Sequence, residues 1–249
     1  MPYDKRLDLE ELKTRRLQTI MMNEGVNRGI PIKRTNLLIN LPFWHPDCQG
    51  SSFVSRDAQR FTMTNTGPTG GSTGLLYDGS DDLSTFPDDP LWTFGTSDLA
   101  FEFWLKTPST ASRQVFTQSN DTDNDYLWVR KLDALQLFVR ENSANILTVT
   151  TDDVVVVANV WAHFVVTRLS GTWYVYKDKV SKAITVGGTV GAGATFPNFT
   201  TPPRIGARLS GGVNYEFLNG TLGEFRAYYE GMTAAEVTQN YEVTKWRYQ

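Results

Sequence analysis

Segments in which apolar and polar residues alternate recur about every ten residues from Thr35 onward, and this spacing constrains the fold more than any other feature of the chain. The clearest segments are residues 99–106, 134–140, 144–150, 161–168 and 172–177. The last two are joined through Ser170 and Gly171, which are typical hairpin-turn residues. The spacing predicts a β-sandwich or barrel. With 249 residues, 40% of them hydrophobic, the chain is long and apolar enough for a full core.

The alternating strands also predict which side chains are buried between the sheets. The expected core residues are Phe101, Phe103, Leu137, Trp161, Val165 and Phe225. The run 154–158 contains four consecutive valines and no polar residue, so we expect a buried strand or a segment that crosses between sheets. A short C-terminal helix is predicted after Thr233, because Thr233 and Glu236 have the spacing of a capping box.

Residues 1–36 differ in character from the rest of the chain. They carry eight Lys and Arg against five acids, a net charge of +3. The remaining residues carry a net charge of −6, so the whole chain has a net charge of −3. Asp8 and Glu11 are spaced for a helix start, an apolar stripe follows, and Gly25 is a plausible end. We therefore expect a helical arm and linker over 1–36 and one domain over 37–249. The helix either docks on its own domain or packs on another subunit.

Composition excludes several classes of protein. The net charge of −3 does not favour nucleic-acid binding, and no apolar run approaches the roughly 20 residues that span a bilayer. The charged N-terminus contains no apolar segment typical of a secretory signal peptide. The single cysteine, Cys48, cannot form an internal disulfide and is expected to be buried or semi-buried. These features predict a protein made in a reducing compartment.

Seven short motifs resemble those of laminin G-like domains in the concanavalin A-like lectin/glucanase superfamily. Residues 76–83 resemble the pattern "FDG-x-DDY", and 161–167 resemble "W-x-H-V-A-x-T". The other matches, in chain order, are residues 101–106 with "T-x-x-x-W-V-K", 173–178 with "W-x-L-Y-V-D-G", 205–207 with "I-G", 219–228 with "F-x-G-x-I-D-E-V-R-I-Y" and 233–241 with "S-x-x-E-I-x-x-N-Y". Lys179 stands where the pattern "W-x-L-Y-V-D-G" has glycine.

The resemblance implies a fold but little about function. It implies a jelly-roll sandwich of two antiparallel sheets over residues 37–249. Residues 41–57 resemble the opening strand of laminin G-like proteins from phage and metagenomic sources. The same fold serves lectins, hydrolases, adhesion modules and capsid proteins.

The chain lacks an obvious catalytic pair of carboxylates. Glycosidases of this superfamily present an E-x-D-x-x-E strand, and this sequence contains no such run. Glu102 and Glu224 are single strand acids, which we expect on a solvated face. His163 occupies a structural strand position of the family, so we interpret it as structural rather than as a catalytic base. We predict that the protein is not an enzyme.

An acidic loop offers a candidate metal site. Asp121, Asp123 and Asp125 supply carboxylates at alternate positions, a spacing that suits Ca²⁺, although we favour a solvated acidic turn. The loop lacks the glycine and the bidentate glutamate of an EF-hand. A second acidic group, Asp78 with 81–82, is interpreted as a turn in which aspartates accept hydrogen bonds from their own backbone.

A candidate carbohydrate site follows this loop directly. Tyr126 and Trp128 lie on one face of a predicted strand, and Asn124 adds an amide nearby. A stacking aromatic face with adjacent amide and carboxylate groups is what a sugar requires. The alternative is that both rings belong to a sandwich core.

These features leave two main hypotheses about function. The first is a non-enzymatic structural protein at a virion surface, phage-like, assembled in the host cytoplasm, which binds other particle proteins and associates with itself through the arm. The second is a carbohydrate-binding or adhesion module that recognises host glycans; the two overlap. A third hypothesis, a glycoside hydrolase, has the least support. No cofactor is required, and Ca²⁺ is the one candidate ion.

Overall fold

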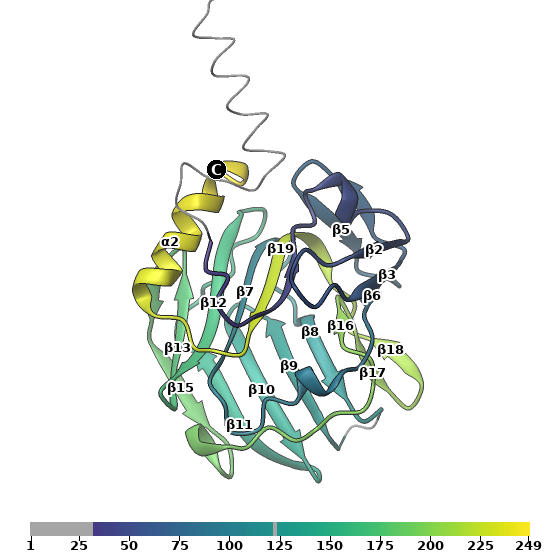
Figure 1. Cartoon of the computed structure of the whole chain (residues 1–249). Coiled ribbons are helices and arrows are strands. Elements are labelled where there is room, and N and C mark those ends of the chain that lie inside the picture. Colours follow the sequence, from purple (N-terminus) through teal and green to yellow (C-terminus); the bar gives the residue numbers. More distant parts are fainter. Residues whose placement is uncertain (1–31, 122–123) are drawn as a thin grey trace, which may run out of the picture.

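Two antiparallel β-sheets pack face to face in the computed structural model, which describes residues 32–121 and 124–249 (Figure 1). The predicted sandwich fold is therefore confirmed. The helix predicted between Asp8 and Gly25 lies outside the described residues, so the boundary at 36/37 stays a prediction. Within the described residues, no helix is long and apolar enough to cross a membrane.

The eight-stranded sheet runs in the order β14, β13, β12, β7, β19, β5, β4, with β1 also paired to β19. Its strands are β1 (Leu37–Leu41), β4 (Thr69–Gly71), β5 (Gly74–Asp78), β7 (Leu99–Lys106), β12 (Ala162–Leu169), β13 (Thr172–Lys177), β14 (Val180–Lys182) and β19 (Asn219–Tyr228). β5 and β1 share one edge of β19, because β5 pairs with 219–222 and β1 with 225–228. Strand β1 thus places the first described segment beside the last strand of the chain.

The nine-stranded sheet runs in the order β15, β11, β10, β9, β8, β16, β6, β3, β2. Its strands are β2 (Ser52–Val54), β3 (Thr62–Thr66), β6 (Leu83–Thr85), β8 (Arg113–Ser119), β9 (Tyr126–Lys131), β10 (Leu135–Glu141), β11 (Ala144–Thr151), β15 (Ile184–Gly187) and β16 (Arg204–Ile205). A separate hairpin, β17 (Arg208–Ser210) with β18 (Val213–Tyr215), lies beside β8. Short 3₁₀ turns are η1 (Pro46–Cys48), η2 (Pro90–Trp92), η3 (Gly191–Gly193) and η4 (Lys245–Arg247).

The predicted hairpin between β12 and β13 is present. Ser170 and Gly171 both have positive φ angles, 50° and 74°, as a tight two-residue turn requires. Asp98 strengthens the turn, because its carboxylate accepts hydrogen bonds from both backbone N–H groups.

The main core lies between the sheets and is rich in aromatic rings. Phe101 and Phe225 of the eight-stranded sheet pack on Phe116 of β8, with ring centroids 5.0 and 5.6 Å apart. Phe103 and Leu137 are also fully buried in this core. Four of the six predicted core residues therefore lie where the alternation placed them.

The prediction is wrong for the other two residues. Val165 is fully buried, but on the outer face of the eight-stranded sheet, where it packs with Tyr228 and Val237. Trp161 precedes β12, is only partly buried and packs against Tyr248 in a tilted arrangement with ring centroids 4.7 Å apart. The reason is that a second layer covers this outer face, so that both faces of β12 are buried and alternation alone cannot distinguish them.

This second layer is helix α2 (Ala234–Thr244) with η4, which lies against the outside of the sheet (Figure 1). The capping box of Thr233 and Glu236 is present as predicted. Trp104 of β7 anchors the layer, because its ring stacks on Tyr241 and Tyr248 and its Nε1 donates to Thr244 Oγ1 at 2.9 Å.

The valine run 154–158 is not a strand but a segment that crosses between the sheets, which was the second of the two alternatives. It forms an irregular connection between β11 and β12, in which Val154 is 68% exposed whereas Val155 and Val156 are buried. The backbone N–H groups of Val155 and Val156 both donate to the carbonyl of Asp133 instead of to a neighbouring strand. β-branched composition favours extended backbone but supplies no strand partner.

Candidate functional site

The predicted aromatic residues form a stack on the outer face of the nine-stranded sheet. Tyr126 and Trp128 lie parallel, with ring centroids 3.8 Å apart and an interplanar angle of 2°, and Phe138 of β10 packs beside both. Their strand neighbours Leu127 and Val129 point into the core, which places the three rings outside it. Trp128 is only 8% exposed, so the stack is a covered layer and not a bare platform.

Guanidinium groups cover the aromatic stack. Arg130 and Arg208 lie over the Trp128 ring at 5.3 and 5.1 Å from its centroid, and Arg140 lies over Tyr126 at 5.9 Å. Arg208 also lies 5.7 Å from the ring of Tyr215, which is 43% exposed on β18. Planar guanidinium groups on aromatic faces form a flat surface whose N–H donors are held in fixed directions.

A chain of amides and hydroxyls extends this surface across β10 and β11. Arg130 Nε donates to Gln136 Oε1 at 2.6 Å, and Gln136 Nε2 donates to Thr150 Oγ1 at 2.8 Å. All three residues are partly exposed. The outer face therefore combines arginine, amide and hydroxyl groups over an apolar layer.

The acidic loop that precedes β9 joins two neighbouring turns. Asp121 Oδ1 accepts from the backbone N–H of Gly212 at 2.8 Å, and Asp125 accepts from the backbone N–H of Asn142. Asn124 Oδ1 accepts from Ser143 Oγ at 2.7 Å. Asp123 lies outside the described residues, so a Ca²⁺ site in this loop stays a prediction.

Among the described residues, Asp78, Asp81 and Asp82 bring carboxylate oxygens within 4.8 Å of one another and could hold a metal ion. The backbone already occupies part of this turn, because Asp82 Oδ2 accepts from the N–H of Asp78 and Asp78 Oδ1 from that of Ser80. This geometry agrees with the expected structural turn. Burial and the neighbouring negative charges raise the pKa of Asp82.

The expectation that Glu102 and Glu224 are solvated is wrong, because α2 and η4 cover both. Glu102 is fully buried and accepts hydrogen bonds from Tyr228 and Asn240, at 2.8 and 2.9 Å. Burial alone would raise the pKa of Glu102, but the charge of Arg226 and the contact with His163 outweigh it and lower the pKa to about 2. His163 is fully buried beside Glu102, in agreement with a structural role.

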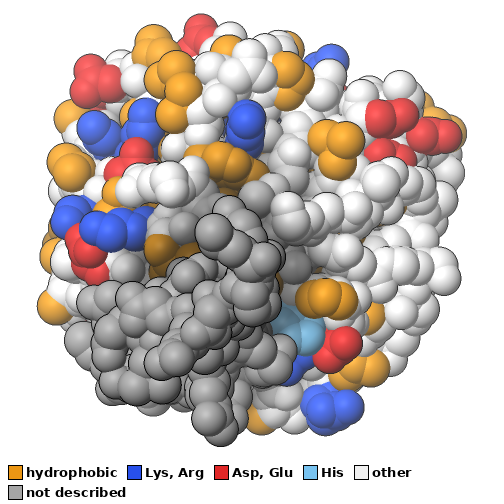
Figure 2. Space-filling view, turned by 90° about the horizontal axis from the view of Figure 1, so that it is seen from above, with side chains coloured by type: hydrophobic (Ala, Val, Ile, Leu, Met, Phe, Trp, Pro, Cys, Tyr) orange, Lys and Arg blue, Asp and Glu red, His pale blue; other side chains and the backbone are white. Residues whose placement is uncertain are grey.

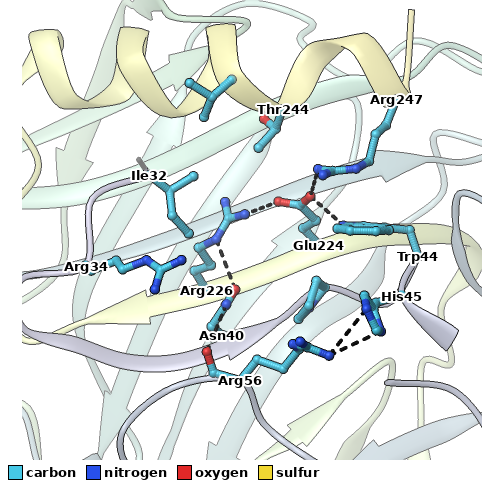
Figure 3. A pocket seen from close by; sticks show the side chains of 12 residues that line it. Ile32, Arg34, Asn40, Trp44, His45, Arg56, Glu224, Arg226, Thr244 and Arg247 are labelled. Atoms are coloured by element: carbon cyan, nitrogen blue, oxygen red, sulfur yellow. Dashed lines mark hydrogen bonds and ion pairs between the residues drawn. The ribbon is translucent and has the colours of Figure 1, made fainter. Parts of the chain in front are cut away.

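Glu224 is the central acid of a polar cavity of about 270 Å³ between β1, β19 and the C-terminal segment (Figure 3). Its carboxylate accepts from Trp44 Nε1 and from Arg247 Nη1, both at 2.7 Å, and also from Arg226 Nη2. The guanidinium of Arg247 stacks on the Trp44 ring at 3.7 Å. Arg226 Nε donates to Asn40 Oδ1 at 3.2 Å.

Arginine dominates the lining of this cavity. Arg34, Arg56, Arg226 and Arg247 all contribute, whereas Glu224 is the one acid among the described lining residues. Burial and the charge of Arg56 lower the pKa of His45, so this imidazole is neutral at pH 7. Figure 2 shows a histidine at the surface next to basic, acidic and hydrophobic side chains. Of the two histidines of the chain, His45 is partly exposed whereas His163 is fully buried.

The arginine-lined cavity could not be predicted from the sequence. Its residues come from three distant segments, around 34–56, 224–226 and 243–247, and no motif spacing links them. Two of them did carry a signal, since Glu224 and Arg226 share one face of a strand and carry opposite charges.

Comparison with known proteins agrees with this architecture. Residues 78–238 match the profile of the concanavalin A-like lectin/glucanases superfamily. The chain belongs to this superfamily. In contrast, no curated protein matches the chain.

Solved structures of this superfamily fold are similar at low sequence identity. The receptor binding domain of botulinum neurotoxin C/D mosaic serotype has a TM-score of 0.62 and 10% identity, over 85% of this chain and 52% of that chain. Domain 4 of AbnA, an arabinanase of Geobacillus stearothermophilus, has a TM-score of 0.57 and 16% identity, over 82% and 98%. A NanB sialidase of Streptococcus pneumoniae has a TM-score of 0.52 and 12% identity, over 70% and 27%.

The chain thus spans about half of the toxin domain and about a quarter of the sialidase. At these identities the similarity shows the fold alone.

Proposed function

We propose that the chain is a carbohydrate-binding module that holds a glycan on the outer face of its nine-stranded sheet. The observation that carries this proposal is the arginine layer over the Tyr126–Trp128 stack, with partly exposed Gln136 beside it. Fixed N–H donors match the hydroxyl oxygens of a sugar, and the exposed ring of Tyr215 offers an apolar face for its C–H groups.

A binding role without catalysis is the second part of the proposal. Glycoside hydrolysis needs two carboxylates that flank the scissile bond, one of them able to donate a proton. The strand acids Glu102 and Glu224 are buried and paired with Arg226, and they lie on the other sheet. The low pKa of Glu102 also keeps it ionised, which is the opposite of what a general acid needs.

The superfamily supports the proposal by analogy. Domain 4 of AbnA, which the chain covers almost completely, is described in complex with arabinotriose. A domain of this size and fold can therefore bind an oligosaccharide.

The test is a glycan array followed by titration calorimetry on the full chain. We expect binding of at least one oligosaccharide, and a roughly tenfold loss of affinity in Tyr215→Ala, which corresponds to about 1.4 kcal/mol. Tyr174→Ala is the matched control, because Tyr174 is 36% exposed on the other sheet. No binding to any glycan, or equal losses in both variants, would overturn the proposal.

A role at a virion surface is a further proposal, and it rests on the charge of the N-terminal segment. Residues 1–36 carry +3 against −6 for the rest of the chain, which favours contact between this segment and the body of another copy or a partner protein. A particle assembled in the host cytoplasm could present the glycan-binding sheet outward. A truncated chain that starts at Thr35 should then fail to assemble and keep the β-rich circular dichroism spectrum, whereas loss of that spectrum would contradict the role.

A further inference from the structure

We infer that the arginine-lined cavity at β1, β19 and the C-terminal segment is a second binding site, specific for a small molecule that carries a carboxylate or phosphate group. This site lies on the outer face of the eight-stranded sheet, so it is separate from the surface proposed above and does not depend on it.

The first argument is the arginine content of the cavity, in which Arg34 is left without an acid among the described residues. Arg226 and Arg247 pair with the two buried carboxylates of Glu102 and Glu224. Arg56 pairs with Asp47 at the rim, at 3.1 Å. The exposed side chain of Arg34 has no hydrogen bond or ion pair with any residue that the structure describes, and in Figure 3 it lies beside Arg226. A guanidinium fork without a carboxylate partner is suited to bind an oxyanion.

The second argument is that buried donors in the cavity are unsatisfied. The Arg226 side chain is only 3% exposed, yet its Nη1 donates no hydrogen bond within the described residues and only lies 3.4 Å from Glu102 Oε2. The Arg247 side chain is 10% exposed, and its Nε likewise has no acceptor among them. Buried N–H groups without an acceptor are costly, and a small rotation of either guanidinium toward an anion in the cavity would relieve that cost.

The space next to the cavity indicates which kind of molecule carries the anionic group. The cavity opens beside a larger hollow of about 770 Å³, and the two share Trp44, His45, Arg56 and Arg247. The lining of the larger hollow includes the apolar side chains of Trp44, Pro46 and the exposed Trp246 beside polar and charged groups. A ligand with its charged group on the arginines and a neutral body against Trp246 fits both spaces, as an acidic sugar or a sugar phosphate would.

The N-terminal segment of the chain is a poor alternative occupant. It leads directly into Ile32, which lines the cavity, but residues 1–31 carry six Lys and Arg against five acids, a net charge of +1. A segment of net positive charge is a weaker competitor for the arginines than a free anion.

The experiment is calorimetric titration of the full chain with sodium D-glucuronate, with inorganic phosphate and with D-glucose, at constant ionic strength. We expect one of the two anions to bind with 1:1 stoichiometry and glucose not to bind. Stronger binding of glucuronate would identify a carboxylate ligand, and stronger binding of phosphate would identify a phosphate ligand. Binding of neither anion, or equal binding of glucose, would overturn the inference.

Two matched variants locate the site. Arg34→Ala removes an exposed side chain that has no partner among residues 32–121 and 124–249, so the fold should persist and anion affinity should fall at least tenfold. Arg140→Ala removes a guanidinium from the nine-stranded sheet and should leave anion affinity unchanged. If Arg140→Ala weakens binding and Arg34→Ala does not, the anion binds on the other sheet and the cavity site is refuted, whatever the outcome of the glycan array.

Discussion

Glu102 Oε1 lies 2.9 Å from Nε2 of His163, and both side chains are fully buried on neighbouring strands beneath helix α2. The other carboxylate oxygen of Glu102 accepts from Asn240, which belongs to the helix itself. One charged group thus connects β7, β12 and α2. Its hydrogen bonds replace the water that burial removes.

Glu102→Gln should therefore destabilise the domain strongly. The substitution leaves the buried guanidinium of Arg226 with less compensating charge and replaces an acceptor oxygen by a donor that faces other donors. Breaking a buried pair in this way typically costs about 3–5 kcal/mol. Urea unfolding followed by tryptophan fluorescence measures the loss. The control Glu141→Gln, at the partly exposed end of β10, should change stability by less than about 0.5 kcal/mol.

The same group predicts how stability depends on acid pH. The folded-state pKa of Glu102 is about 2, below its ordinary value of 4.5, so the folded state favours the ionised form. This contribution is present above pH 4.5 and is lost as the pH falls towards 2, with a magnitude of about 3 kcal/mol. Urea midpoints measured between pH 6 and pH 2 should fall less steeply in Glu102→Gln than in the wild type. Equal slopes in the two proteins would contradict the assignment.

A buried lysine predicts a rise of stability with pH in the alkaline range as well. Lys131 is fully buried, and burial followed by the charge of Arg113 lowers its pKa from 10.5 to about 8. The unfolded chain then binds more protons than the folded chain between pH 8 and 10.5, so stability should rise with pH in this window. The measurement is best stopped near pH 9.5, before tyrosines of raised pKa such as Tyr77 oppose the trend.

Lys131→Met tests this assignment, since it keeps the length of the side chain and removes the titrating group. The rise of the urea midpoint between pH 8 and 9.5 should disappear in this variant. Lys106→Met, at the partly buried end of β7, should retain it. A rise that persists in Lys131→Met would mean that another group titrates.

The alternation of apolar and polar residues was enough to predict the sandwich, because it distinguishes the two faces of each strand. On that basis the sequence places Phe101 and Phe225 correctly in the core. It did not show that α2 covers the outer face of the eight-stranded sheet. For this reason Val165 was assigned to the wrong layer, and Glu102 and Glu224 were expected in solvent. The helix was predicted, but the surface on which it packs depends on long-range contacts such as Trp104 with Tyr248. Local pattern does not encode such contacts.

The two layers predict different costs for aromatic truncation. Phe225 is fully buried between Phe101 and Phe116, so Phe225→Ala should cost about 3–5 kcal/mol through lost contacts and the resulting cavity. Trp161 is partly exposed at the outer layer, so Trp161→Ala should cost clearly less, about 1–2 kcal/mol, because water can fill the space. Chemical denaturation of both variants measures the difference. Equal costs would mean that the outer layer is packed as tightly as the core.

Asp121 predicts a link between the acidic loop and the proposed glycan surface. Its Oδ1 accepts from Gly212 N–H and its carbonyl from Gly211 N–H, so it holds the turn between β17 and β18. That hairpin carries Arg208 over Trp128 and also the exposed Tyr215. Asp121→Ala should loosen the hairpin, lower stability by about 1 kcal/mol and weaken glycan binding without removing any group from the surface itself.

Calcium separates this hairpin-holding role of Asp121 from that of a metal ligand. If the carboxylate only holds the hairpin, millimolar Ca²⁺ leaves the Tm of the wild type and of Asp121→Ala unchanged, because the backbone N–H of Gly212 already occupies Oδ1. A rise in Tm with Ca²⁺ that Asp121→Ala abolishes would instead establish the loop as a cation site. Hydrogen exchange at Gly211 and Gly212 completes the test, since both amides should exchange faster in Asp121→Ala whether or not Ca²⁺ is present.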